Sequence, residues 1–216
     1  MTQTALIDIV PDVRQVCRKA PNATIIRALN RAAREFCKQT RWMRFQLSGE
    51  TVADTAQFSM GSDPDLEIIG IKAASAARQS GNTQPWPLHV SAATTWPAGQ
   101  RTAAPRRYAY VPESIIALNP TPDEVYDLVL TIVVQPTLAA TSIPSQLLVR
   151  WDRAIKAGAL AYLLELPDQE WTDKAMAQIK LREFQSSVNN ARADEQREYQ
   201  AGTVIARRRP FIVGGI

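Results

Sequence analysis

The sequence predicts an α+β protein in which β-strands lie between helices, and three observations lead to this class. Apolar residues recur every three to four positions between residues 22 and 41, which is the period of an amphipathic helix. Short runs rich in β-branched and aromatic residues replace that period between residues 43 and 135. Helical spacing returns after residue 142. We therefore expect an antiparallel β-domain inserted between two helical segments.

The N-terminal residues are expected to form a helical hairpin. A short helix should lie between about Leu6 and Lys19, begun or interrupted near Pro11, because proline suits the first turn of a helix. A longer helix follows Pro21, with Asn22 as a possible cap, and runs to about Arg41. Its apolar face consists of Ile25, Ile26, Leu29, Ala32, Ala33, Phe36 and Cys37.

The opposite face of this helix carries a cationic stripe, defined as Arg27, Arg31, Arg34, Lys38 and Arg41. Steps of four and three residues place these side chains in one line along the helix. Like charges at this spacing destabilise a helix unless something compensates them. Two interpretations stay open: a solvated face of a core helix, or a surface that contacts DNA phosphates or an acidic partner.

The β-region is expected to form a small sheet or barrel, because its runs are separated by turn residues rich in glycine, asparagine and proline. The segment from Gln84 to Pro105 should be ordered but irregular. The predicted strands are Met43 to Leu47, Thr51 to Phe58, Leu66 to Ala74, Arg107 to Val111, Ser114 to Leu118 and Asp127 to Val134.

Two long helices should complete the chain before its tail. The first begins near Ser142, a plausible cap, and Pro167 ends it. The second should run from Thr172 to near Tyr199, a length of about 40 Å. Its second half is nearly all polar, so we expect it to project from the domain or to lie against another subunit.

The chain ends in a basic and then apolar segment, Arg207, Arg208, Arg209, Pro210, Phe211, Ile212 and Val213. Apolar residues at a terminus favour a docking contact, and Pro210 prevents a continuing helix. The expected division of the chain is residues 1–42 for the N-terminal helices, 43–135 for the β-domain, 136–201 for the C-terminal helices and 202–216 for an extended docking tail.

Composition indicates an ordinary globular chain with unevenly distributed charge. The formal net charge is +4, yet residues 1–44 hold nine Lys or Arg against three acids, so basic ends flank an acidic middle. No basic leader or long apolar run predicts secretion or a membrane span. Cys17 and Cys37 lack metal-ligand spacing and are expected to be buried free thiols. We expect no metal and no cofactor.

The sequence carries no catalytic motif for a nucleophile, a metalloprotease or a nucleotide-binding loop. The one histidine, His89, has no nucleophile nearby and is interpreted as a structural or surface residue. Asp123 and Glu124 lie in a predicted turn, and Asp194 and Glu195 on a predicted solvated helix. The triplet of residues 106–108 is a poor nucleic-acid signal. We therefore predict no catalytic site and no enzyme.

Two segments carry a resemblance to a known family. Residues 26–42, from Ile26 to Trp42, and residues 153–173, which hold Arg153 to Leu164 and then Pro167 and Trp171, resemble the helices of head-to-tail adaptor proteins of tailed bacteriophages. That group includes the tail tubular A proteins. The order of the parts is similar along the whole chain.

The resemblance implies a helical bundle, formed by the N-terminal hairpin and the two C-terminal helices, with an inserted antiparallel β-domain and an extended tail. It also implies a homo-oligomeric ring, commonly of twelve copies, in the virion neck, with assembly in the host cytoplasm. The partners would be the portal, which the tail from Arg207 to Val213 would contact, and a tail or nozzle protein. DNA would pass through the ring without sequence specificity, and no membrane is implied.

The alternative from another class is a small DNA-binding protein that uses the 22–41 helix. Its basic residues line a whole helical face rather than one end, and the β-region has no role in that scheme. A salt-dependent shift of duplex DNA by the monomer would favour this alternative.

Overall fold

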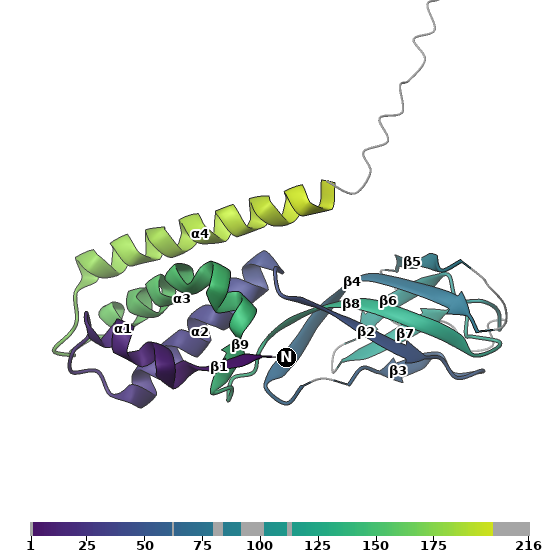
Figure 1. Ribbon diagram of the computed structural model, residues 1–216, viewed down its shortest axis with the longest axis horizontal. Helices are drawn as coiled ribbons and strands as arrows, with labels where there is room; N and C mark the ends of the chain where they lie inside the picture. Colours follow the sequence, from purple (N-terminus) through teal and green to yellow (C-terminus); the bar gives the residue numbers. More distant parts are fainter. Residues whose placement is uncertain (1, 62, 80–83, 92–101, 112–113, 201–216) are drawn as a thin grey trace, which may run out of the picture.

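The computed structural model describes residues 2–61, 63–79, 84–91, 102–111 and 114–200. Figure 1 shows an elongated molecule with helices gathered at one end and a twisted sheet at the other. The chain passes from the helices to the sheet and back again: α2 (Asn22–Thr40) is followed directly by a strand of the sheet, and the last long strand leads back to α3 (Ser145–Glu165).

The helical end is built from three packed helices, α2 (Asn22–Thr40), α3 (Ser145–Glu165) and α4 (Lys174–Gln200). Figure 1 shows α4 lying along the outside of α3. Before α2 the chain forms a 3-10 helix, η1 (Leu6–Ile9), and a five-residue helix, α1 (Val10–Arg14). α3 departs from helical geometry at Trp151, where φ is −122° and ψ is 18°.

The larger sheet has seven strands in the order β2, β8, β4, β5, β6, β7, β3. All neighbours are antiparallel except β5 and β6, which are parallel, so the sheet is mixed. A separate two-stranded sheet pairs β1 (Gln3–Ala5) with β9 (Ser142–Pro144). The seven strands are β2 (Arg44–Glu50), β3 (Gln57–Ser59), β4 (Leu66–Arg78), β5 (Trp86–Val90), β6 (Arg107–Val111), β7 (Ile115–Asn119) and β8 (Tyr126–Pro136).

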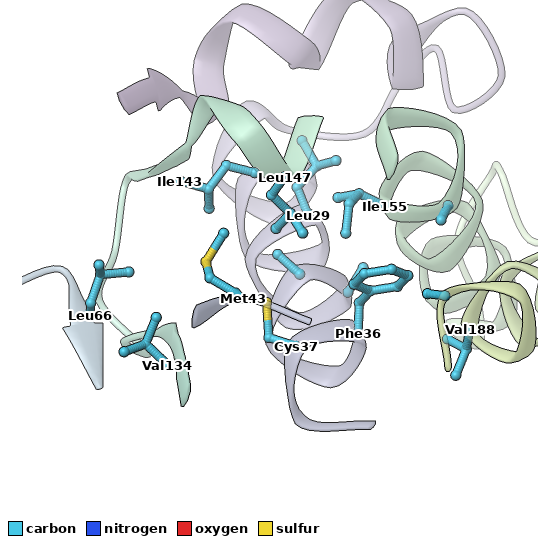
Figure 2. Close-up of a cluster of buried hydrophobic side chains, with 14 of the residues drawn as sticks. Leu29, Phe36, Cys37, Met43, Leu66, Val134, Ile143, Leu147, Ile155 and Val188 are labelled. Atoms are coloured by element: carbon cyan, nitrogen blue, oxygen red, sulfur yellow. The ribbon is translucent and has the colours of Figure 1, made fainter. Parts of the chain in front are cut away.

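One continuous apolar core runs from the helices into the sheet and includes Leu88, Ile116 and Leu128. Figure 2 shows Leu29, Phe36 and Cys37 of α2 surrounded by side chains of the other elements. Met43 lies between α2 and the sheet, and the Val134 amide donates to its carbonyl at 3.1 Å. The neighbours drawn there are Leu66, Val134, Ile143, Leu147, Ile155 and Val188. The sheet is therefore packed against the helices and does not stand apart from them.

The predicted helical bundle with an inserted antiparallel β-domain is wrong. The fold is β-rich, with a curled, mixed seven-stranded sheet that forms one end of the molecule. β4 extends over 13 residues and shifts register twice against β8, between Ile68 and Gly70 and between Ile71 and Ala73. Such bulges bend a strand and increase its twist, which allows the sheet to curl.

The prediction from the sequence underestimated the extent of the strands, because several strands contain residues that favour other structures. The last part of β4 is alanine-rich, and alanine is depleted in strands, yet Ala74 and Ala76 are buried between neighbours. β5 contains Pro87, which donates no hydrogen bond, and lies where an irregular segment was predicted. The short helix expected between about Leu6 and Lys19 is present in part: η1 covers Leu6–Ile9, α1 begins beside Pro11 as predicted, and α1 ends at Arg14 rather than near Lys19.

Candidate functional site

α2 positions the cationic stripe by burying its opposite face. Pro21 is extended, with φ −62° and ψ 146°, so the helix begins directly after it. Arg41 adopts the left-handed conformation, with φ 51°, and its amide donates to the Cys37 carbonyl at 2.8 Å. The helix therefore ends at Thr40, and Arg41, the last residue of the stripe, is its C-cap. The residues buried on the core face are Ile25, Ala28, Leu29, Ala32, Ala33, Phe36 and Cys37.

The structure brings all five residues of the stripe to one hollow, called here the cationic groove. Its volume is about 760 Å³, and Arg27, Arg31, Arg34, Lys38 and Arg41 line it from α2. The remaining lining residues come from α2, from β4 and β8 and from the segment after β8: Asn30, Glu35, Ile69, Gln135 and Leu138. The groove thus lies where α2 meets the sheet.

Arg34 has a structural role at the floor of this groove. Its guanidinium donates to the Pro136 carbonyl at 2.5 Å and pairs with the Glu67 carboxylate at 3.2 Å. Gln135 donates to the same carboxylate at 3.0 Å. The Arg34 side chain is only 20% exposed. It therefore attaches α2 to β4 and β8 and has little surface left for a ligand.

The other four cations of the groove are exposed to solvent. The Arg31 guanidinium lies 4.4 Å from the centre of the Tyr162 ring, a distance typical of a cation–π contact. In the part of the chain that the structure describes, Arg27, Lys38 and Arg41 have no acidic partner. Like charges three and four residues apart repel one another. The groove is therefore suited to bind carboxylates or phosphates.

A second, smaller hollow lies between α2, α3 and α4, on the other side of Arg31 and Glu35. Its volume is about 400 Å³ and its floor is formed by small residues and Phe184. A Cβ atom added at Gly158 would lie 2.8 Å from a ring carbon of Phe184 and 3.0 Å from the Cβ atom of Ala32. The three helices thus approach one another closely at this point, and a larger residue at 158 would separate them.

The distal half of α4 is attached to the rest of the molecule by charged side chains. The Glu195 carboxylate binds the guanidinium of Arg44 on β2 and the ammonium of Lys72 on β4. All three side chains are at most 20% exposed. Asp194 pairs with Arg150 at 3.0 Å, and Arg192 donates to a backbone carbonyl of α2 at 2.9 Å.

These contacts correct the expectation that α4 projects and that Asp194 and Glu195 are solvated. Their partners lie between 44 and 151 residues away in the sequence, and no local pattern on α4 indicates them. An acidic residue on a mostly polar helix gives the same sequence signal whether it is solvated or paired. α4 therefore bridges the helices and the sheet.

The other residues singled out from the sequence are the histidine, the two cysteines and the docking residues of the tail. His89 lies exposed on β5, which confirms its interpretation as a surface residue. Cys17 and Cys37 are buried free thiols, as expected, and burial raises the pKa of Cys37 to about 12. The predicted docking residues Arg207, Arg208, Arg209, Pro210, Phe211, Ile212 and Val213 lie outside the described residues.

The described ranges of the chain lack two further kinds of functional feature. No group of three or more His, Cys, Asp or Glu side chains in these ranges is arranged to hold a metal ion. Among the described helices, none combines the length and the apolar character that a membrane span needs.

An exposed groove lined by five cations and one acid can attract a partner that carries negative charge. The family model described as SU10 adaptor protein matches residues 3–208. The chain therefore belongs to the SU10 adaptor protein family, which is a family of phage head–tail adaptors. The resemblance to phage adaptors is thus confirmed at the level of the family. No curated protein matches the chain.

Proposed function

We propose that this protein is a ring-forming adaptor of the phage neck that connects the portal to the tail. The observation that carries the proposal is the match of the adaptor family over residues 3–208. Within that family we propose the connector subtype that includes the tail tubular A proteins. The ring would contain twelve copies, and its channel would let DNA pass between portal and tail without sequence specificity.

The C-terminal tail is the proposed contact with the portal. It would bury Phe211, Ile212 and Val213, while the arginines from Arg207 to Arg209 pair with acidic groups of the portal. α4 supports this role because the Glu195 contacts fix its distal half to the sheet. The tail follows α4 directly in the sequence.

The cationic groove is the second proposed contact of the assembled particle. Four exposed cations and the partly buried Arg34 line it, and the described part of the chain supplies a single acidic lining residue, Glu35. A partner that contributes negative charge would relieve the repulsion along α2. The other proposed partner is a tail or nozzle protein on the opposite side of the ring, and the protein would lie in the virion after assembly in the host cytoplasm.

The alternative of a small DNA-binding protein is disfavoured by the position of α2. A recognition helix must present a free face to the major groove. α2 instead packs against α3, α4 and β8, and Arg34 is bound to the sheet at the middle of the stripe. A rigid duplex would therefore contact only part of the stripe.

Truncation tests the tail contact directly. A chain lacking residues 206–216 should remain folded and fail to co-sediment with the portal protein. The matched control is the full-length chain with Gly214 and Gly215 each replaced by serine, which should co-sediment normally because the docking residues remain. Normal portal binding by the truncated chain would disprove the docking role.

A further inference from the structure

We propose that the cationic groove of one copy receives the acidic tip of the sheet of a second copy. The acidic tip is defined as Glu50, Asp54, Asp123 and Asp127 together with the exposed Val52 and Val125. This inference rests on the proposed function, because it names the surfaces through which copies of the ring contact one another.

The groove combines charge with apolar surface, and this combination favours a protein segment as its occupant. Leu138 lines the groove and is 84% exposed, and Ile69 also lines it. A leucine so exposed is expected to be covered in an assembly. DNA phosphates would pair with the cations but would leave Leu138 in water. An acidic segment that also carries apolar side chains would satisfy both parts of the groove.

The acidic tip has this composition. Glu50, Asp54, Asp123 and Asp127 are all exposed, and between them lie Val52 and Val125, which are 58% and 39% exposed. The tip lies where β2 ends and β8 begins, so its residues come from two loops and two strand ends.

Hydrogen bonds hold the two loops of the tip together. The Thr51 amide donates to the Tyr126 carbonyl at 2.9 Å, and the Tyr126 amide donates to the Thr51 hydroxyl at 2.8 Å. The Asp54 amide donates to the Pro122 carbonyl at 2.8 Å. The tip is therefore preorganised, and little conformational entropy is lost when it binds.

Both surfaces carry like-charge repulsion that contact between them would relieve. Glu50 and Asp127 are directly opposite in the β2–β8 pair, where like charges destabilise a sheet. On the groove, Arg27 and Arg31 are four residues apart on the same face of α2. Placing the acids against the cations turns two unfavourable arrangements into one favourable arrangement.

A copy cannot fill its own groove, because groove and tip lie at opposite ends of β8. Gln135 lines the groove near the end of β8, and Asp127 belongs to the tip near its beginning. Eight residues of strand separate them by about 26 Å. The contact must therefore join two copies through different surfaces. Such head-to-tail contacts form a ring when the rotation between copies closes.

Charge reversal tests the inference with the full-length chain. The groove variant carries Arg27→Glu and Lys38→Glu, and the tip variant carries Glu50→Lys and Asp127→Lys. The tip variant keeps two like charges opposite each other, so its fold retains the repulsion of the wild type. The matched control is Arg14→Glu with Arg18→Glu, because both arginines are exposed and lie outside the groove.

Native mass spectrometry, with and without the portal protein, measures the assembly. Each variant alone should lose rings, with at least about a tenfold weaker contact between copies, because two side chains of the contact then repel their partners and the altered surface loses its net charge. An equimolar mixture of the two variants should recover rings of alternating copies, since both kinds of contact are again complementary. The control should assemble as the wild type does.

Three results would overturn the inference. Rings that persist in the groove variant would show that the groove is not at the contact, and failure of the mixture to recover rings would show that the tip is not its partner. Intact rings with weakened duplex DNA binding would assign the groove to DNA instead. If the wild-type chain forms rings, each of these results rejects the contact between groove and tip but not the proposed adaptor function. If the wild-type chain forms no ring even with the portal protein, both the contact and the proposed function are wrong.

Discussion

Replacing Glu195 with alanine tests whether charged contacts hold α4 to the sheet. The wild-type carboxylate neutralises Arg44 and Lys72, which come from two different strands. The substitution would leave both cations close together and four-fifths buried, since their side chains are 20% and 19% exposed. Removing one partner of a fully buried ion pair costs about 3–5 kcal/mol.

The expected loss is smaller than that range because water still reaches about a fifth of each side chain. We expect the free energy of unfolding to fall by about 2–3 kcal/mol. For a chain of this size, that corresponds to a decrease in Tm of about 5–10 °C. Hydrogen exchange should accelerate most in α4 beyond Ala191, where apolar packing gives way to the charged contacts.

Urea unfolding of the variant and its controls provides the measurement. Glu183→Ala on the same helix is the matched control, because its partner Lys180 is three residues away and the Glu183 side chain is 51% exposed. The control should cost less than about 1 kcal/mol. Adding Lys72→Ala to Glu195→Ala should recover part of the lost stability. A change of less than about 0.5 kcal/mol for Glu195→Ala would refute the role assigned to these contacts.

Two other substitutions have defined outcomes. Gly158→Ala should lower the free energy of unfolding by about 1–3 kcal/mol, because its Cβ atom would lie 2.8 Å from the Phe184 ring. The control is Gly49→Ala, whose Cβ atom would meet no atom within 4 Å. In the same urea titration the control should change the free energy of unfolding little. Burial and a hydrogen bond to Asp123 raise the pKa of Tyr126 to about 12. The protonated Tyr126 should therefore contribute its full share to the free energy of unfolding below pH 10. That free energy should fall by up to about 1.4 kcal/mol per pH unit between pH 10 and 12. Unfolding curves at pH 9 and pH 11 should show this loss in the wild type and not in Tyr126→Phe, and an equal loss in both would contradict it.

The sequence was most informative where periodicity is strong and local. α2 covers Asn22–Thr40, close to the predicted span, because its apolar face repeats over five turns. The cap position is Pro21 and not the predicted Asn22, which is the first residue of the helix. Its cationic stripe was also visible, since it depends only on helical spacing. The family could be inferred from the helical segments, although they carry no catalytic motif.

The sequence was least informative where distant residues determine the structure. The role of Arg34 depends on Glu67 and Pro136, which lie 33 and 102 residues away. The strand of Ala73 to Ala77 forms because β8 and β5 cover it, in spite of its weak local propensity. The acidic tip consists of two loops that are adjacent in space but distant in sequence, so no local stretch of the sequence contains it.

Single-particle cryo-electron microscopy of the full-length protein mixed with the portal protein tests the central proposal most directly. We predict a closed ring coaxial with the portal, with residues 206–216 of each copy on the portal surface and an open channel wide enough for duplex DNA. Copies bound singly to the portal, or no ring at any ratio of the two proteins, would contradict the proposed function.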